Sequence, residues 1–138
     1  MLDIDHFKAF NDGCGHAAGD QMLRSIGGLV LDHLRAGDIA CRYGGEELLL
    51  ILPEASIEAA AHRAEDLRTR AKKLEVMHLE TPLGPVTVSL GVAVYPAHGR
   101  TRDALLAAAD ASLYRAKQDG RDRVAVAGTA ARDQAAAG

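Results

Sequence analysis

The fold is decided by the stretch Arg42-Tyr43-Gly44-Gly45-Glu46-Glu47-Leu48, which lies between the apolar runs 39–41 and 49–52. Two adjacent glycines between strand-like segments predict a tight two-residue hairpin turn, because such turns need positive φ at both central positions. Glu46 and Glu47 follow at once, and adjacent carboxylates repel each other unless solvent or a cation lies between them. Taken alone, the stretch favours a solvated hairpin with two acidic side chains over a ligand site.

The composition is that of a single soluble globular domain: 138 residues, 48% hydrophobic and 25% charged. The net charge of −3 argues against a general nucleic-acid binder. Any phosphate ligand would then be held by local cations, backbone amides or a metal. Cys14 and Cys41 fit neither a disulfide framework nor a zinc site, so the expected compartment is the cytoplasm. No apolar run is long enough to span a membrane, and no signal peptide precedes the first charged residues, so we expect no membrane contact.

The hydrophobic pattern along the chain predicts helices and strands in mixed order. The expected elements are the tail of a strand at 1–4, a helical turn at 5–12, a helix at 15–36, a helix capped by Ser56, strands at 76–79 and 85–95, a helix from Thr101 to Gly120, and a strand at 124–126. Residues 127–138 are rich in Ala and Gly and predict a disordered tail. This order indicates an α+β fold, in which helices pack on one antiparallel-containing sheet.

Four carboxylates lie where these elements end. Asp3 and Asp5 are at the end of the first strand, and Glu46 and Glu47 are at the tip of the hairpin. If the two strands are neighbours, the acids converge, and Mg²⁺ bound by one or two carboxylates together with substrate phosphates is the usual counter-charge. Two metals would polarise both an attacking hydroxyl and a leaving phosphate. The alternative is that these acids are surface charges on separate edges, and sequence spacing does not choose between the two.

Several motifs carry a family resemblance. They are Asp3-Ile4-Asp5-His6-Phe7-Lys8, Asn11-Asp12, Gly15-His16, Gly19-Asp20, the stretch 42–48, Ser89-Leu90-Gly91-Val92-Ala93, Ala109-Asp110, Leu113-Tyr114, Ala116-Lys117 and Gly120-Arg121. In order and spacing they resemble the signature of GGDEF domains, the diguanylate cyclases. The resemblance implies a catalytic domain at 1–126 that is truncated at its N-terminus. It also implies a central mixed, largely antiparallel sheet flanked by helices, as in the nucleotidyl cyclase/polymerase palm fold, without the N-terminal helix of that fold.

The resemblance also implies an activity. Members of this family condense two GTP molecules into cyclic di-GMP and release two pyrophosphates, with Mg²⁺ as the cofactor. Each domain would hold one GTP, and two domains would meet face to face in a homodimer. One alternative is a truncated or degenerate module that binds GTP or cyclic di-GMP without turnover. Another is a palm-like nucleotidyl cyclase or polymerase that acts on a different nucleotide.

Carried over position by position, the resemblance implies roles for individual residues near the acids. Asp3 and the carbonyl of Ile4 would bind the metal, together with Glu46 and Glu47. Glu46 would also be the candidate base for the 3′-hydroxyl, and Glu47 would support the same site. A carboxylate on a divalent cation lowers the barrier to deprotonating a ribose hydroxyl.

Phosphate binding is implied for a second group. The backbone N–H groups of His6 and Phe7 would cradle the β- and γ-phosphates at the start of a helix. Lys8, Lys117 and Arg121 would add positive charge there, and the resemblance also implies a catalytic role for Lys8. The last two are four residues apart near a helix end, so we expect them to point the same way. The alternative for that pair is that the two cations complement the helix dipole.

Guanine recognition is implied for Asn11 and Asp20, because an amide and a carboxylate suit the edge of that base, and His16 would help to order the pocket. Arg35-Ala36-Gly37-Asp38 matches the Arg-x-x-Asp inhibitory site of many diguanylate cyclases, which binds the product.

The alternative for Arg35 and Asp38 is an exposed ion pair at a helix terminus. Family members often add an arginine from the following helix to this site, and Arg63 and Arg68 are the candidates. Two positions depart from the family pattern: Leu48 replaces a phenylalanine, and Asp122 replaces an asparagine.

Overall fold

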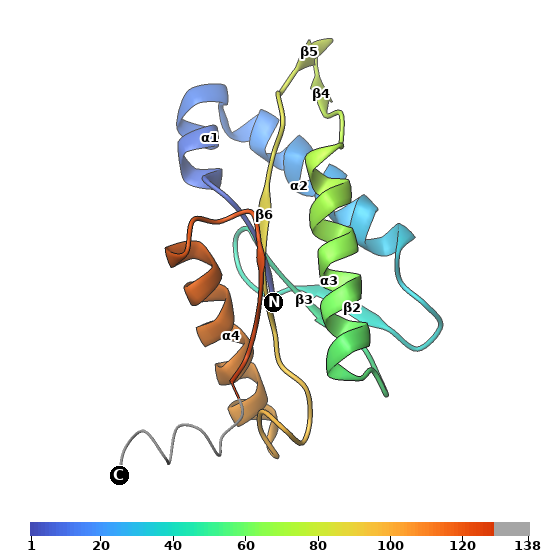
Figure 1. Ribbon diagram of the computed structural model, residues 1–138. Helices are drawn as coiled ribbons and strands as arrows, with labels where there is room; N and C mark the ends of the chain where they lie inside the picture. Colours follow the sequence, from blue (N-terminus) through green and yellow to red (C-terminus); the bar gives the residue numbers. More distant parts are fainter. Residues whose placement is uncertain (129–138) are drawn as a thin grey trace.

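The computed structural model describes residues 1–128, and Figure 1 shows how its helices surround a central sheet. The elements are β1 (Leu2–Ile4), α1 (Phe7–Cys14), α2 (His16–Asp32), β2 (Ile39–Arg42), β3 (Glu47–Ile51), α3 (Ile57–Lys72), β4 (Met77–His78), β5 (Thr81–Pro82), β6 (Val88–Val92), α4 (Arg102–Gln118) and β7 (Val124–Val126). The disordered tail predicted at 127–138 falls almost entirely outside the described residues. Among residues 1–128, no helix is both long and apolar enough to cross a bilayer.

Five strands form the main sheet in the order β2-β3-β1-β6-β7. Neighbouring strands are antiparallel except β6 and β7, which run parallel. The predicted mixed, largely antiparallel sheet is therefore confirmed. The central strand β1 is three residues long, and its Leu2 lies opposite Leu48 of β3 and Leu90 of β6. This short strand therefore sets the register between the two halves of the sheet.

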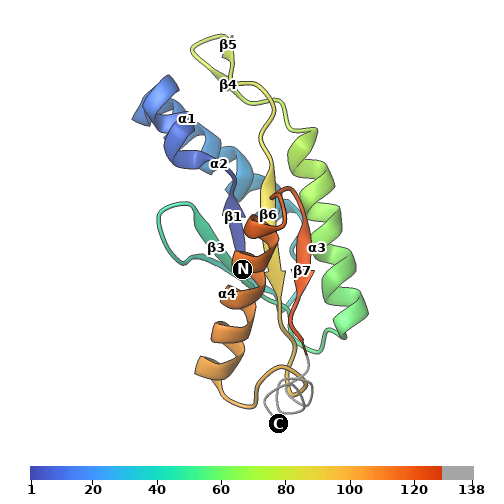
Figure 2. The ribbon, with the colours of Figure 1, turned by 60° about the vertical axis from the view of Figure 1, so that its left-hand side comes forward.

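Helices cover both faces of the sheet, and Figure 2 shows α4 and α3 on either side of β6 and β7. On the face covered by α2 and α3, Ile4 shares a buried cluster with Met22 and Leu67. On the opposite face, Met1 packs against Leu113 of α4. Because successive side chains of a strand point to opposite faces, Asp3 faces α4 as Met1 does.

The helix α4 packs closely on β6 because the sheet has no side chain at Gly91. A Cβ at that position would lie 2.2 Å from the carbonyl oxygen of Ala109 and 2.4 Å from the backbone nitrogen of Leu113. Any larger residue would push the helix away from the sheet. Gly91 therefore sets the height of α4 above the sheet, and with it the position of side chains in the last turn of that helix.

The N-termini of the two long C-terminal helices lie where the sequence predicts them. Ser56 Oγ accepts a hydrogen bond from the Ala59 N–H at 3.1 Å, and Thr101 Oγ1 accepts one from the Ala104 N–H at 3.1 Å. Each hydroxyl satisfies one of the backbone donors that a helix leaves unpaired at its start. Both predicted N-caps are confirmed.

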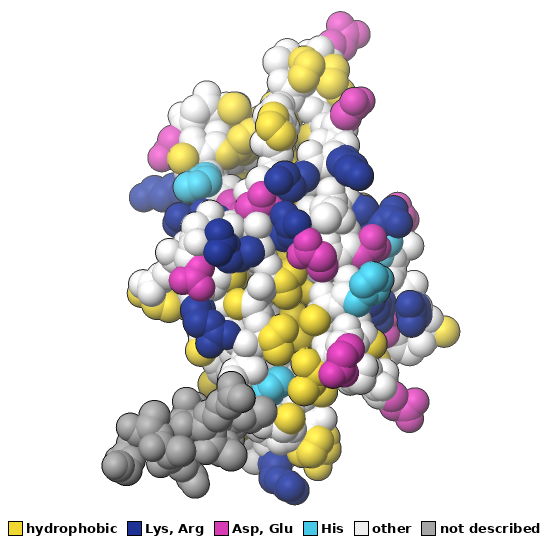
Figure 3. Space-filling view, viewed as in Figure 1, with side chains coloured by type: hydrophobic (Ala, Val, Ile, Leu, Met, Phe, Trp, Pro, Cys, Tyr) yellow, Lys and Arg dark blue, Asp and Glu magenta, His cyan; other side chains and the backbone are white. Residues whose placement is uncertain are grey.

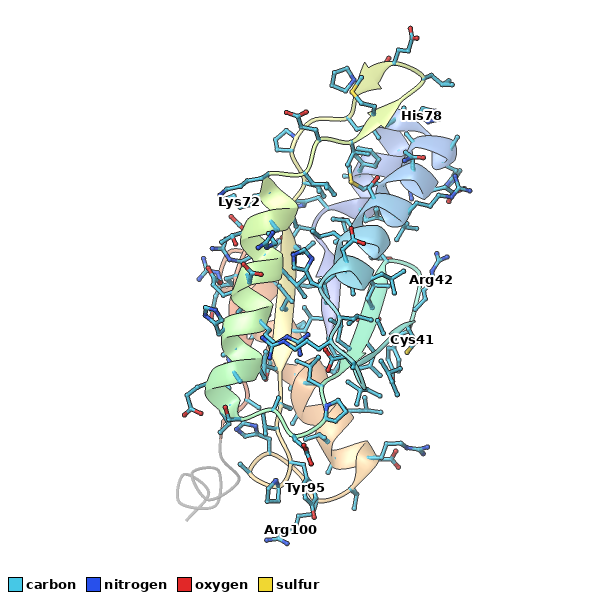
Figure 4. All side chains as sticks on the ribbon, turned by 90° about the vertical axis from the view of Figure 1, so that its right-hand side faces the viewer. Cys41, Arg42, Lys72, His78, Tyr95 and Arg100 are labelled. Atoms are coloured by element: carbon cyan, nitrogen blue, oxygen red, sulfur yellow. The ribbon has the colours of Figure 1, made fainter. Side chains whose placement is uncertain are left out.

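The hairpin of β2 and β3 is confirmed, but the predicted two-residue turn is wrong. Four residues, 43–46, separate the strands, and neither Gly44 nor Gly45 has a positive φ. The loop is closed by the Tyr43 N–H, which donates to the Glu47 carbonyl at 2.8 Å. Arg42, labelled in Figure 4 at the outer edge of the sheet, donates from Nε to the carbonyls of both glycines. A four-residue loop spreads the reversal over more bonds, so left-handed dihedrals are not required.

Three other boundaries differ from the prediction. The strand expected at 76–79 is only β4, which pairs with β5 in a separate two-stranded sheet. The strand expected at 85–95 is limited to the five residues of β6. Pro82 and Pro85 have no backbone N–H to donate, which disfavours a continuous ladder through this segment. The first long helix ends at Asp32, four residues earlier than expected.

Candidate active site

The acidic residues predicted to converge lie on neighbouring strands. In the antiparallel pair of β1 and β3, Asp3 lies directly opposite Glu47, and the Ile4 N–H donates to the Glu46 carbonyl at 3.4 Å. Residues directly opposite each other on paired strands project from the same face. The register therefore brings together acids that are far apart in the sequence, on the face of the sheet that α4 covers.

Asp3 is a buried carboxyl with one close cationic partner. Its side chain is 5% exposed, and Lys117 Nζ donates to its Oδ2 at 2.8 Å. Burial raises the pKa of Asp3 to about 6, Lys117 acts in the opposite direction, and the charges of Glu46 and Glu47 raise it further. Lys117 is thus the local counter-charge of a group of acidic side chains that repel one another.

The donor atoms at this site suit a hard divalent cation. Asp3, Glu46 and Glu47 offer carboxylate oxygens, and Ile4 offers a carbonyl. Within residues 1–128, no three acidic, histidine or cysteine side chains come close enough together to enclose a cation. Mg²⁺ is usually held by one or two carboxylates plus substrate phosphates and water rather than by a closed protein cage. The residues present therefore fit Mg²⁺ bound together with a nucleotide.

The start of α1 offers backbone donors beside these acids. His6, the N-cap, has a left-handed φ of 56°, and its side chain makes no capping hydrogen bond. The first N–H groups of a helix have no partner within that helix, so those from Phe7 onward can bind an anion. A pocket of about 280 Å³, lined by residues that include Ile4 and His6, opens here. Lys8 lies exposed on the first turn.

The residues implied in guanine recognition lie on two helices that contact each other, α1 and α2. Asn11 Oδ1 is buried and has no hydrogen-bond partner within the described part of the chain. It lies against Gly19, where a Cβ would fall 1.7 Å from this oxygen. A buried amide oxygen without a partner is costly, so its presence marks a position where a ligand donor would be stabilised. His16, the first residue of α2, and Asp20, four residues later, are both exposed.

Lys117 and Arg121, expected to point the same way near a helix end, lie on different local structures. The helix α4 ends at Gln118, and Arg121 lies beyond it with a left-handed φ of 61°. Its N–H donates to the Ala116 carbonyl at 3.0 Å, which folds the chain back over the end of the helix. The two cations therefore depend on different local structures, a helical turn and a loop.

The Arg-x-x-Asp motif contains an ion pair, but Arg35 does not supply its cation. Arg63 on α3 donates from Nη2 to Asp38 Oδ2 at 2.6 Å, and the Arg35 backbone N–H donates to the same oxygen at 2.8 Å. The Arg63 hydrogen bond, followed by that of Arg35, lowers the pKa of Asp38. Of the two candidate helical arginines, Arg63 is the one beside the motif, whereas Arg68 bonds to Glu65 and to the loop after α4.

Asp5, grouped with the acids from sequence, does not join them. Its two oxygens accept hydrogen bonds from Thr87 and Ser89 near β6 and from the backbone of Asp122. The signal in the sequence was its place at the end of a buried strand, where an acid needs donors, but the identity of those donors depends on strand order. Asp122 contacts cations of α3, and Figure 3 shows basic and acidic side chains interspersed over this part of the surface.

A cavity of about 960 Å³ lies away from the acids, between β3, β6 and the helices. Leu49–Leu52 and Leu90–Tyr95 form much of its wall. Among the residues expected to bind GTP, metal or product, Arg35 and Arg63, both assigned to the product, line it, and none of the residues expected to bind GTP or metal does. Its largely apolar lining does not suit a triphosphate, so the cavity is not the substrate site.

The chain is similar in sequence to known proteins over most of its length. The family model described as "Diguanylate cyclase, GGDEF domain" matches residues 1–123. Diguanylate cyclase VdcA of Vibrio cholerae is 44% identical over 126 residues, which are 90% of this chain and 37% of that protein. The chain spans between 19% and 37% of the length of VdcA and two other curated relatives.

Solved structures are also similar to this chain in their fold. The GGDEF domain of DgcB from Caulobacter crescentus, solved in complex with c-di-GMP, has a TM-score of 0.84 and 37% identity, covering 91% of this chain and 74% of that one. The active GGEEF domain of a diguanylate cyclase from Vibrio cholerae has a TM-score of 0.83 and 28% identity, covering 94% and 81%. The signature that names this second domain, GGEEF, carries two glutamates after its glycines, as Glu46 and Glu47 follow Gly45 here.

Proposed function

The chain belongs to the GGDEF domain family, and from that premise we propose that residues 1–126 form the catalytic domain of a diguanylate cyclase. Two GTP molecules would be joined by two 3′–5′ phosphodiester bonds into cyclic di-GMP, with release of two pyrophosphates. The observation that carries the proposal is the pairing of Asp3 with Glu47 across β1 and β3, with Lys117 against Asp3. An acidic pair with a partly exposed lysine beside it suits a site in which a bound metal–triphosphate complex would replace the lysine as the counter-charge.

Mg²⁺ is the cofactor that this donor set fits. Asp3, Glu46 and Glu47 would hold it with the carbonyl of Ile4, and it would supply charge neutralisation at the phosphates and acidify the ribose hydroxyl. Glu46, at the tip of the hairpin, would accept the proton of the 3′-hydroxyl. Glu47 would hold Glu46 and the cation in place, because the position of Glu47 is fixed by the pairing of β3 with β1.

The nucleotide would be bound by groups on either side of the acids. The amides of His6 and Phe7 at the start of α1 would bind the terminal phosphates, with charge from Lys8, Lys117 and Arg121.

Asn11 and Asp20 would bind the guanine, assisted by His16. The buried, unpartnered Asn11 Oδ1 supports this role, since guanine carries N–H donors on the edge that an amide oxygen can meet.

Catalysis would need two copies of the domain. Each copy binds one GTP, and the 3′-hydroxyl of one nucleotide must lie in line with the α-phosphate of the other. No single domain presents both reactants, so a homodimer of facing domains is part of the proposal. The reaction would take place in the cytoplasm, where GTP is available.

Product control is a further part of the proposal. Arg35 and Asp38 would bind cyclic di-GMP together with Arg63, whose guanidinium lies 2.6 Å from the aspartate. Arginine forks suit phosphate and guanine edges, and the aspartate can accept from guanine N–H groups. The DgcB structure in complex with c-di-GMP supports a site for this product in the family.

The test is incubation of the chain with GTP and Mg²⁺, followed by chromatography of the nucleotides. We expect cyclic di-GMP and two equivalents of pyrophosphate, and loss of both in Glu46→Gln. Retention of GTP without any product, at concentrations where the chain is dimeric, would favour a binding module. Equal turnover of ATP would favour a palm enzyme with another substrate.

A further inference from the structure

The carboxyl of Asp5 is buried and fully engaged. Its side chain accepts from Ser89 Oγ at 2.7 Å through Oδ1, and from Thr87 Oγ1 at 2.7 Å and the Asp122 backbone N–H at 3.0 Å through Oδ2. The residue is 6% exposed. Ser89 belongs to β6, Thr87 immediately precedes that strand, and Asp122 belongs to the loop that follows α4. The carboxyl therefore joins that loop to the end of β1, two residues from Asp3.

The loop after α4 has a backbone that an isolated chain would rarely adopt. Arg121 and Asp122 have φ values of 61° and 47°, both in the left-handed region. Such a conformation is costly for residues with a side chain and persists only where the surroundings impose it. The hydrogen bond from the Asp122 N–H to Asp5 falls within this pair of residues.

A second contact holds the same loop from the side of α3. Asp122 Oδ1 lies 2.7 Å from Arg68 Nη1, and Oδ2 lies 2.8 Å from Lys72 Nζ. Lys72, labelled in Figure 4, lies at the C-terminal end of α3. These ion pairs are partly exposed, so they are weaker anchors than a buried charge-assisted hydrogen bond.

We propose that Asp5 is a positioning residue that fixes the left-handed pair Arg121–Asp122, so that Arg121 is held at the phosphate side of the nucleotide site. This inference rests on the proposed function, in which Arg121 binds phosphate. Asp5 acts through the backbone of the loop and is not a metal ligand. Its oxygens already accept three hydrogen bonds, and they are directed at β6 and the loop.

The hydrogen-bonding chemistry of the Asp5 carboxyl suggests two variants that distinguish a positioning role from metal binding. In Asp5→Asn the amide oxygen still accepts from the Asp122 N–H, and the amide nitrogen can donate to Ser89 Oγ, which is also an acceptor. In Asp5→Leu the shape is similar and every acceptor is lost. A metal ligand would lose its function in both variants, since neither carries a negative charge. A positioning residue is rescued by Asn and not by Leu.

The first experiment is amide hydrogen exchange without nucleotide or metal. We expect the Asp122 N–H of the unaltered chain to be protected, and residues 119–123 of Asp5→Leu to exchange at least about tenfold faster. Asp5→Asn should remain within about threefold of the unaltered chain. If the Asp122 N–H of the unaltered chain exchanges as fast as that of an unstructured peptide, the inference is overturned, even if Asp5→Leu does not fold.

The second experiment measures binding of magnesium pyrophosphate by calorimetry and steady-state kinetics with GTP. We expect Asp5→Leu to weaken pyrophosphate binding and raise KM by about tenfold, with a smaller effect on kcat, and Asp5→Asn to keep both. Equal loss in the two variants would assign Asp5 to the metal instead. The exchange and pyrophosphate measurements need no turnover, so they remain informative if the chain proves not to be a cyclase.

Two controls separate positioning from general stability. Ser89→Ala removes a donor to Asp5 but leaves its bond to the loop, so we expect lower stability with unchanged KM. Asp122→Asn keeps the backbone N–H and weakens the ion pairs with Arg68 and Lys72, so we expect a smaller rise in exchange than for Asp5→Leu. A KM increase in Ser89→Ala as large as in Asp5→Leu would show that loss of stability alone produces the effect and would overturn the inference.

Discussion

Lys117 Nζ lies 2.8 Å from Asp3 Oδ2, and 114 positions separate the two residues in the chain. The first strand and the last helix thus meet at one ion pair, which lies among the acids proposed to bind metal. In the absence of a cation, the lysine neutralises a carboxyl that is nearly excluded from solvent.

Replacing that lysine should destabilise the chain without ligands. Lys117→Met leaves Asp3 buried without its charged donor, and such a loss costs about 1.5–3 kcal/mol in the free energy of unfolding. Urea denaturation measures it, with Lys73→Met, an exposed lysine at the end of α3, as the matched control. We also expect cyclase activity to fall at least about tenfold. Equal unfolding midpoints for the two variants would contradict the first expectation.

The raised pKa of Asp3 gives a pH dependence of stability. Between pH 4 and 6 the folded chain keeps a proton on Asp3, whose pKa is about 6, while the unfolded chain, with a pKa of 3.8, has released it. The free energy of unfolding should therefore fall as pH rises through this window. Denaturation midpoints of the unaltered chain and of Asp3→Asn measure it without metal or nucleotide. Asp3→Asn lacks this contribution, so parallel profiles would contradict the expectation.

Gly19 and Gly28 lie on the same helix and should respond in opposite ways to alanine. A Cβ at Gly19 would overlap Asn11 Oδ1, so Gly19→Ala should cost about 1–3 kcal/mol and displace the proposed guanine-binding amide. Gly28 has nothing within 4 Å of a Cβ, so Gly28→Ala should stabilise the helix by about 0.5–1 kcal/mol.

Thermal unfolding compares the two glycine variants, and competition of ATP against GTP reports base selectivity. We expect only Gly19→Ala to lose preference for GTP. If Gly28→Ala loses it equally, the effect comes from α2 as a whole and not from Asn11.

Product inhibition should depend on Arg63 as much as on Arg35. Arg63→Ala removes the guanidinium beside Asp38, so cyclic di-GMP should inhibit the variant at least about tenfold less strongly. Arg35→Ala should behave similarly. The matched control is Arg70→Ala, which breaks an exposed pair with Asp66 on the same helix and should change inhibition and stability little. Unchanged inhibition in Arg63→Ala would remove that arginine from the site.

The sequence predicts the local features of this fold well, because they depend on nearby residues. The caps at Ser56 and Thr101 are properties of a hydroxyl and a backbone amide three residues later. The turn at Gly44-Gly45 was predicted wrongly because dipeptide chemistry does not specify the number of residues in a loop. Strand order is also beyond local pattern, since it depends on which apolar faces pack together.

The candidate site shows the same difference between local features, which the sequence predicts, and long-range contacts, which it does not. The acids at Asp3 and Glu47 could be selected from sequence as candidates, but their pairing follows from the register of β1 and β3. The role of Arg63 depends on how α3 lies beside the loop that joins α2 to β2, and no spacing rule gives that distance. Asp5 was grouped with the wrong partners because its side chain direction depends on hydroxyl donors more than 80 positions away.

The central strand also has a consequence for how the chain folds. The residues of β1 bond to β3 and β6, whose sequence positions begin at Glu47 and Val88. During synthesis, β1 leaves the ribosome well before β6, so the middle of the sheet closes only after Val88–Val92 has been made. Closure of the sheet is therefore a late step in the assembly of this domain, and a chaperone that shields β1 until β6 is available would help it most.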